Sequence, residues 1–300
     1  MSAWIASDQF RDRSARPMNY RHSYHAGNFA DVLKHAVLAQ IITYLKRKDQ
    51  AFRIIDTHAG IGLYDLSSKE AQKTGEWHGG VGRVMEAKPS DQLAAFLAPW
   101  LTAVREMNPD GGMRLYPGSP KLARLLFRKQ DRLSAIELHP ADAKQLRSVF
   151  EGDYQVRVTE LDGWLSLGAH LPPKEKRGLV LIDPPFEQEG EFDRLVDGLA
   201  RATRRFPGGT YMLWHPIKAD SPLATFDKKL IALARPRTLT VRLLVRDNKI
   251  SPSLNGTGLV IVNPPFTLES ELKAVLPELV TILAEGPGAV SEVRVLVGES

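Results

Sequence analysis

The chain has 300 residues, of which 40 are Lys or Arg and 35 are Asp or Glu, giving a net charge of +5 at pH 7 and a pI of about 9.3. It contains no cysteine, which excludes disulfides and thiolate metal sites. Its hydrophobic fraction of 43% suits a globular core, and no apolar run is long enough to cross a membrane. We therefore expect a cytoplasmic protein, and the positive charge favours a polyanionic partner.

The first predicted element is a helix that begins after Asn28 and ends near Lys46. Asn28 is well placed as its N-cap. Apolar residues recur at helical spacing along it, namely Phe29, Val32, Leu33, Val37, Ile41, Tyr44 and Leu45.

Seven short β-type runs follow, each ending on or directly before a polar residue: 52–56, 133–137, 156–161, 179–183, 210–214, 239–245 and 259–263. Helical patterns separate most of them, for example at 119–128, 141–150, 189–205, 222–234 and 268–283. This alternation predicts an α/β fold with a doubly wound, mostly parallel sheet and helices on both faces. The last two runs are joined by a turn without helical pattern, which favours an antiparallel final pair.

An insertion is predicted between the first two strands. In a nucleotide-binding βαβ unit the acid that ends the second strand lies about 20 residues beyond the glycine turn. Here Asp56 and Glu137 are much farther apart. We expect a small helical subdomain at about 63–116, in which 91–107 has the apolar stripe of a helix.

Polar residues end four successive strands: Asp56, Glu137, Asp162 and Asp183. Ligands of doubly wound sheets bind beyond the carboxyl ends of the strands, so these residues outline a cofactor site. Glu137 would bind the ribose hydroxyls, and Asp162 with Gly163 would meet the adenine ring of the cofactor. The glycine turn after Asp56 would by itself fit an ordinary tight turn equally well, and it lacks the third glycine of an NAD fingerprint.

The most specific motif is Asp183-Pro184-Pro185-Phe186, at the end of an apolar strand. A carboxylate and a nearby backbone carbonyl can accept hydrogen bonds from an amine while the ring stacks on a base. The prolines fix the backbone, so the motif can orient an amine for methyl transfer. As an isolated string it could also be a Pro-Pro turn with Phe186 in the core.

A similar motif, Asn263-Pro264-Pro265-Phe266, follows the last predicted strand. Asn also accepts from an amine, so chemistry does not separate the two motifs. We place Asn263 toward the far edge of the sheet, away from the cofactor, and interpret it as structural.

Aromatic and cationic side chains are dense from Tyr20 to Asn28. With His35 and His58 they raise the possibility of a metal site, but no His pair at i, i+4 has a neighbouring acid, so no metal is expected. Such residues stack on unpaired bases and bond phosphates, which favours RNA.

Six motifs together resemble the RlmJ family of bacterial adenine-N6 methyltransferases that act on 23S ribosomal RNA. The resemblance runs from Met18 to the C-terminus and is carried by Tyr20-Arg21-His22-Ser23-Tyr24-His25-Ala26-Gly27-Asn28, Asp31-Val32-Leu33-Lys34-His35, Asp56-Thr57-His58-Ala59-Gly60, Tyr116-Pro117-Gly118-Ser119-Pro120, Glu137-Leu138-His139-Pro140 and Asp183-Pro184-Pro185-Phe186. It implies a seven-stranded Rossmann-like class I methyltransferase that uses S-adenosyl-L-methionine.

The resemblance also implies roles for individual residues. Those implied to contact S-adenosyl-L-methionine are His35, His58, Ser119, Glu137, Asp162, Gly163 and Asp183. Asp183 would also be the catalytic acceptor, and Tyr20 with Pro184, Pro185 and Phe186 would meet the RNA. The family commonly has Tyr where this chain has Phe186, and stacking needs only the ring. Residues 1–17 precede the usual start, so we expect a disordered extension there, Met18 as the functional start, and one monomeric methyltransferase domain over 18–300.

Three other functions would each use part of these features. A DNA adenine-N6 methyltransferase would use the same tetrapeptide on a base extruded from a duplex. A nicotinamide-dependent oxidoreductase would use the glycine turn but has no role for Asp183. A non-catalytic RNA-binding module would use only the charge and the aromatic segment.

Overall fold

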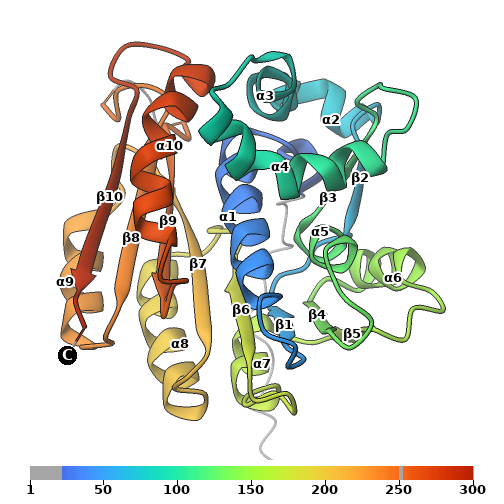
Figure 1. The fold of residues 1–300 in the computed structure, drawn as a ribbon. Coiled ribbons are helices and arrows are strands. Elements are labelled where there is room, and N and C mark those ends of the chain that lie inside the picture. Colours follow the sequence, from blue (N-terminus) through green and yellow to red (C-terminus); the bar gives the residue numbers. More distant parts are fainter. Residues whose placement is uncertain (1–21, 250–252, 300) are drawn as a thin grey trace, which may run out of the picture.

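The computed structural model describes residues 22–249 and 253–299, which form an α/β sandwich around one eight-stranded sheet (Figure 1). The strand order is β10-β8-β9-β7-β6-β1-β4-β5. The strands are β1 (Arg53–Asp56), β4 (Arg132–Glu137), β5 (Val156–Glu160), β6 (Gly178–Ile182), β7 (Thr210–Ile217), β8 (Thr238–Leu244), β9 (Gly256–Val262) and β10 (Val290–Val297). The mostly parallel, doubly wound fold predicted from the sequence is confirmed.

Two groups of helices cover the two faces of the sheet. The first apolar core joins one face to α1 (Phe29–Leu45), α5 (Ser119–Leu125), α6 (Pro140–Val149) and α10 (Leu268–Leu283). The second joins the other face to α7 (Gly163–Ala169), α8 (Glu191–Arg205) and α9 (Leu223–Ala232). Alternate residues of β6 enter the two cores, Leu179 and Leu181 the first, Val180 and Ile182 the second. Burial on both faces explains why this strand reads as a continuous apolar run.

The segment between β1 and β4 carries extra structure beside the sheet. Its elements are β2 (Leu63–Asp65), α2 (Lys69–Thr74), the π-helical turn η2 (His78–Gly82), α3 (Arg83–Glu86), α4 (Asp91–Glu106) and β3 (Leu115–Pro117). β2 and β3 pair with each other in a separate two-stranded sheet. α4 packs on α1 through its buried stripe, which includes Leu93, Leu97 and Trp100.

Helix α1 is buried almost all round. From Phe29 to Ala39 every residue is buried, including Asp31, Lys34 and His35. The Asn28 side chain accepts hydrogen bonds from the backbone N–H groups of Ala30 and Asp31, which confirms the predicted N-cap. A helix without a polar face must find partners for its charged side chains inside the protein.

The sequence predicts seven strands, and the sheet has eight because β10 was not predicted. β10 is an edge strand that pairs only with β8 among the described strands, and all of its residues are exposed or half-buried. Its sequence therefore lacks the apolar signal of a strand with two covered faces. The predicted antiparallel pair of β8 and β9 is confirmed.

Asn263 lies in the half of the sheet away from β1, β4 and β5, as expected, but β9 is not an edge strand, because it lies between β8 and β7. β9 runs antiparallel to β7, so its carboxyl end reaches the edge where the parallel strands begin. Asn263 donates hydrogen bonds from Nδ2 to the carbonyls of Pro207 (3.0 Å) and Gly209 (2.8 Å), just before β7. Because β9 runs in the opposite direction, Asn263 lies at the amino ends of the parallel strands, whereas Asp183 lies at their carboxyl ends.

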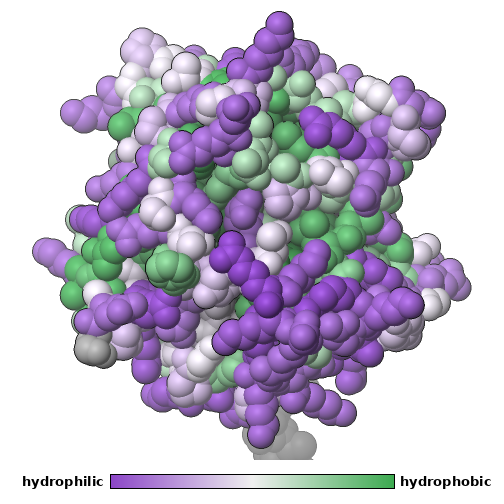
Figure 2. All heavy atoms as spheres, in the orientation of Figure 1, coloured by the Kyte–Doolittle hydropathy of each residue, from purple (hydrophilic) through white to green (hydrophobic). Residues whose placement is uncertain are grey.

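Hydrophilic side chains gather on one part of the surface, over the loops below α1 and before β4 (Figure 2). Exposed cations there include Arg47, Lys48 and Lys129. These loops enter β1 and β4, so they too lie at the amino ends of the parallel strands. Among the described residues of the chain, no helix is long and apolar enough to cross a membrane.

Asn263 should stabilise the fold through both its backbone and its side chain. Its φ of +51° lies in the left-handed region, and its amide makes the two bonds described above. We expect Asn263→Ala to lower the free energy of unfolding by roughly 2 kcal/mol in urea denaturation. Asn263→Gly suits this φ and should cost less, whereas an unchanged midpoint in both variants would contradict the assignment.

Candidate active site

Asp183 follows β6 at the point where the strand order reverses. β1 pairs in parallel with β4 on one side and β6 on the other. The chain continues from β4 to β5 on one side and from β6 to β7 on the other, so the crevice between β1 and β6 is the topological switch point. The predicted tetrapeptide therefore stands where ligands of such sheets bind.

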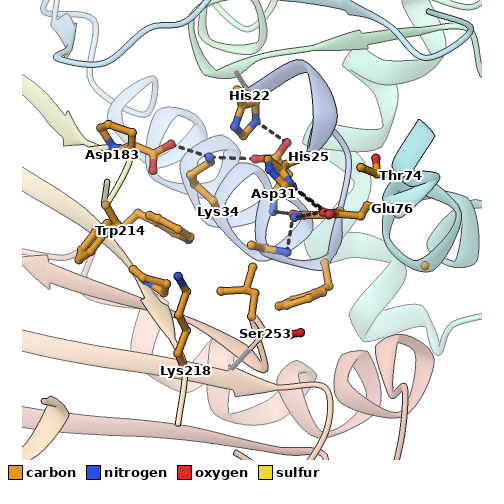
Figure 3. A pocket seen from close by; sticks show the side chains of 18 of the residues that line it. His22, His25, Asp31, Lys34, Thr74, Glu76, Asp183, Trp214, Lys218 and Ser253 are labelled. Carbon is orange, nitrogen blue, oxygen red and sulfur yellow. Dashed lines mark hydrogen bonds and ion pairs between the residues drawn. The ribbon is translucent and has the colours of Figure 1, made fainter. Parts of the chain in front are cut away.

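An ion-paired lysine holds the Asp183 carboxylate (Figure 3). Lys34 Nζ lies 2.6 Å from Asp183 Oδ2 and 2.8 Å from Asp31 Oδ1. Asp31 also accepts from His22 Nε2 at 3.0 Å and from the backbone N–H of Gly27 at 2.9 Å. The Lys34 and Asp31 side chains are 4% and 1% exposed, whereas Asp183 is 14% exposed and lines a cavity.

The two buried partners of this network are charged at neutral pH. Burial alone would lower the pKa of Lys34, but Asp183 and Asp31 together raise it above its ordinary value. Burial would likewise raise the pKa of Asp31, but the neighbouring His22, Lys34 and His35 hold it well below the usual range. A buried cation between two carboxylates fixes α1 to the end of β6.

A cavity of about 740 Å³ opens beside Asp183. Phe186 and Trp214 form an aromatic wall, with ring centroids 5.7 Å apart in an edge-to-face arrangement. Phe186 is half-buried and its φ of +53° places the ring at the end of the turn. Trp214 Nε1 donates to Thr257 Oγ1 at 2.7 Å, which fixes the indole. The wall and the carboxylate together suit a planar ring that carries an amine.

A second set of polar groups lies along the carboxyl ends of β1 and β4. Ser119 Oγ donates to Asp56 Oδ2 at 2.6 Å. Glu137 accepts from the backbone N–H groups of Gly60 and His139, each at 2.8 Å. Burial raises the pKa of Asp56 to about 7, and burial also raises the pKa of Glu137.

The remaining predicted cofactor residues continue this set toward β5. The Asp162 side chain caps α7 by accepting from the N–H groups of Trp164 and Leu165. At Gly163 a Cβ would stand 2.3 Å from the Thr57 carbonyl and 2.7 Å from the His58 ring, so glycine is required there. The turns after β1 and β5 therefore pack directly on each other.

The two predicted histidines differ in accessibility. His58 is half-buried, bonds Thr57 Oγ1 at 2.8 Å, and has its pKa lowered to about 4 by burial. His35 is 1% exposed and bonds Tyr116 Oη at 2.8 Å, and burial lowers its pKa to about 3. Both rings are therefore neutral at pH 7. His35 supports β3, which leads to Ser119.

The inserted segment holds the amino end of α1. Glu76 accepts from Asn28 Nδ2 at 3.0 Å and bonds His25 Nδ1 at 2.9 Å. The backbone N–H of Val81 donates to the Gly27 carbonyl at 2.8 Å. A Cβ on Gly80 would meet that carbonyl at 2.1 Å, so the two backbones touch. The insertion thereby fixes the helix that carries Asp31 and Lys34.

The predicted site residues fall into two neighbouring groups. Asp183, Pro185 and Phe186 line the cavity, while Pro184 is buried behind them. The cofactor set, His58, Ser119, Glu137, Asp162 and Gly163, borders the ends of β1, β4 and β5. Tyr20 lies outside the described residues, so its role stays a prediction, as does the disordered extension at 1–17.

Lys34 and Trp214 were not selected from the sequence as site residues. For Lys34 a signal was present, because a lysine in a helix that is apolar on every side requires a buried partner. Nothing in the local sequence of Trp214 distinguishes it from a core tryptophan. Over residues 22–249 and 253–299, no group of three or more His, Cys, Asp or Glu side chains could hold a metal ion.

The doubly wound sheet, the acids at its strand ends and the tetrapeptide at its switch point define a Rossmann-like methyltransferase. A family model described as "Ribosomal RNA large subunit methyltransferase D, RlmJ" matches residues 49–296. The chain belongs to this family.

Relatives and a solved structure agree with this assignment. The chain is 42% identical to Ribosomal RNA large subunit methyltransferase J of Escherichia coli (strain K12), over 87% of this chain and 92% of that protein. It is 41% identical to the protein of the same name from Haemophilus influenzae, over 91% and 96%. A crystal structure of a Legionella pneumophila protein that is 33% identical covers 90% of this chain and 98% of its own, with a TM-score of 0.81.

Removing the buried ammonium should destabilise the protein in a pH-dependent way. Lys34→Met leaves Asp31 buried without its cation, and we expect a loss of about 3 to 5 kcal/mol in unfolding free energy at pH 7. In the native protein the low pKa of Asp31 contributes stability above the unfolded-state pKa, and this stability is lost as pH falls through the native pKa.

In the Lys34→Met variant the unpaired carboxylate gains a proton more readily, so the difference between the two proteins should narrow from pH 7 to pH 4. Urea denaturation across this range measures it. Lys34→Met/Asp31→Asn is the control, and it should recover part of the loss at pH 7. A constant difference at all pH values would contradict the role of Asp31.

Proposed function

We propose that the protein transfers a methyl group from S-adenosyl-L-methionine to the exocyclic N6 amine of an adenine in 23S ribosomal RNA. The observation that carries this proposal is the Asp183 carboxylate, which is held by Lys34 at the switch point and faces a cavity walled by Phe186 and Trp214. The relatives are named as large-subunit ribosomal RNA methyltransferases. Such an enzyme would act on RNA in the cytoplasm, and we propose that it acts as a monomer.

The residues at the ends of β1 and β4 fit the cofactor. Asp56 Oδ1 is buried and has no hydrogen-bond partner in the described part of the chain, so it can accept from the ammonium of the methionine moiety. Glu137 keeps acceptor capacity for ribose hydroxyls, because a carboxylate offers about four lone-pair sites and backbone N–H groups do not fill all of them. Asp162 and Gly163 would border the adenine ring, with His58 and Ser119 beside them. When bound, S-adenosyl-L-methionine supplies an electrophilic methyl group on its sulfonium.

The residues of the cavity would then orient the base. The N6 amine donates one hydrogen bond to Asp183 and the other to a backbone carbonyl of the Pro184-Pro185 turn. This arrangement directs the nitrogen lone pair out of the hydrogen-bonded plane, toward the cofactor side of the site. Phe186 stacks on the base, and the prolines keep carboxylate, carbonyl and ring in fixed relation. The rate enhancement comes mainly from this positioning.

The DNA alternative uses the same tetrapeptide but is not favoured by the relatives, which are named for ribosomal RNA. Methyl transfer from labelled cofactor to 23S RNA, DNA and protein in parallel separates the classes. Transfer to RNA alone is expected, and exclusive transfer to DNA would overturn the proposed substrate.

Asp183→Ala should abolish most activity without unfolding the sheet. The variant loses the acceptor for the amine, and we expect the single-turnover rate on RNA to fall by roughly 100-fold or more. Asn263→Ala is the matched control, because the similar motif lies at the other edge of the sheet; below its melting temperature it should keep its rate. Wild-type turnover by folded Asp183→Ala would refute the catalytic role.

Cofactor affinity should depend on the protonation of Asp56. Its pKa of about 7 in the ligand-free protein is caused chiefly by burial. An arriving ammonium favours the ionised carboxylate, so binding releases a proton below pH 7. The dissociation constant for S-adenosyl-L-methionine should therefore fall as pH rises from 6 to 7.5 and level off above. Calorimetry in buffers of different ionisation enthalpy detects the proton, and Asp56→Asn should bind more weakly with a flat profile.

A further inference from the structure

The cavity extends well past the site proposed for the base. It begins at Asp183 and Phe186, follows the wall formed by β7, and reaches the segment after β8. Trp214, Pro216 and Lys218 all line it. Trp214 and Pro216 lie at alternate positions of β7 and therefore on one face of that strand, and Lys218 directly follows its last residue, Ile217. In Figure 3 Lys218 lies beyond Trp214, on the side away from Asp183.

The distance from Trp214 to Lys218 matches one nucleotide. Trp214 directly follows Leu213, which pairs with Ile182, so Trp214 lies level with Asp183. A strand rises about 3.3 Å per residue, which places the Cα of Lys218 roughly 13 Å farther along the chain direction than the Cα of Trp214. This separation is comparable with the distance from the amine edge of an adenine to the phosphate of the same nucleotide, and the flexible lysine stem covers the difference.

Lys218 differs from the other cations of the cavity. Lys34 is paired with Asp31 and Asp183, and Arg246 is paired with Glu285. Among the described residues no carboxylate bonds Lys218 Nζ, although its side chain is half-buried. Its backbone is fixed, because its N–H donates to Ser221 Oγ at 2.9 Å and its carbonyl accepts from the Ser221 N–H at 3.1 Å.

The other walls of the cavity carry carboxylates. Glu76 lies on the side of the insertion, Glu187 follows the tetrapeptide, and Glu285 lies near the far end. Among the described residues that line the cavity, carboxylates outnumber Lys and Arg side chains. A phosphate is therefore best bound beside a cation that has no carboxylate partner. Within the described lining that place is the end of β7.

We propose that Lys218 binds the RNA backbone phosphate adjoining the target adenosine. The base then lies against Phe186 and Trp214, the ribose passes over Pro216, and the phosphate meets the Lys218 ammonium. This ion pair fixes how far the base enters the pocket and excludes a free adenine base as a good substrate. The inference rests on the proposed RNA methylation and adds a contact to the substrate that this activity does not by itself require.

A cycle of single changes in the protein and in the RNA tests the contact. Lys218→Met removes the charge and keeps the stem, and a methylphosphonate at the 5′ or 3′ linkage of the target adenosine removes one phosphate charge. The RNA is a fragment of 23S RNA that the wild-type enzyme methylates, with the target mapped by mass spectrometry. Lys218→Met alone, and the methylphosphonate at the contacted linkage alone, should each lower kcat/KM roughly tenfold. At that linkage, which is one of the two, the variant acting on the modified RNA should lose no more in kcat/KM than either single change.

Two further measurements separate this contact from a general effect of charge. Lys218→Met should reduce the salt slope of RNA binding by about 0.7, as expected for one contact to a single strand, and should leave S-adenosyl-L-methionine affinity unchanged. Lys228→Met on α9 is the matched control, because Lys228 is exposed and does not line the cavity. It should keep the wild-type slope and the wild-type response to methylphosphonates.

These measurements separate failure of the Lys218 contact from failure of the proposed RNA methylation. If the wild-type enzyme methylates no RNA, the proposed function fails first. If it methylates RNA but the effects of Lys218→Met and of both methylphosphonates are additive, only the phosphate contact is overturned. A Lys218→Met protein that loses cofactor affinity as well would also overturn it, because the lysine would then act on the fold of the site.

Discussion

The structure depends on one buried cation. Lys34 is almost completely enclosed, and an ammonium in such a place is tolerated only if carboxylates surround it. Asp31 comes from the same helix, but Asp183 comes from the end of β6, on the far side of the switch point. The pairing therefore requires the amino-terminal part of α1 to lie beside the carboxyl end of β6. The fold and the reacting carboxylate are thereby fixed by the same interaction.

The insertion extends this constraint to a third part of the chain. Glu76 and the backbone at Gly80 contact the turn that precedes α1. Asn28 links the two parts, because it bonds Glu76 and also caps the helix. A small helical insertion could have been an appendage. Here it closes one side of the cavity and holds the end of α1 nearest to Asp31 and Lys34.

Local patterns in the sequence predicted the site residues that stand directly at the ends of strands. Asp56, Glu137 and Asp183 each follow an apolar strand, and parallel strands bring such residues to one edge without further information. Lys34 and Trp214 escaped prediction because their roles depend on neighbours far away in the chain, such as Asp183 for the lysine. The position of β9 between β7 and β8 likewise depends on the pairing of β9 with β7, a strand that does not precede it directly in the chain.

Asp56 and Asp183 follow adjacent strands but have different partners, and this difference separates their roles. Asp56 is buried and is not paired with a cation as Asp183 is, so burial raises its pKa to about 7 and an arriving cation would stabilise its charge. Asp183 already shares the Lys34 ammonium, so a second cation would gain less there, whereas a neutral amine can still donate to its free oxygen. The same residue type thus suits a cationic cofactor at β1 and a neutral base at β6. Exchanging the two ligands would leave the Asp56 charge unpaired in the protein interior.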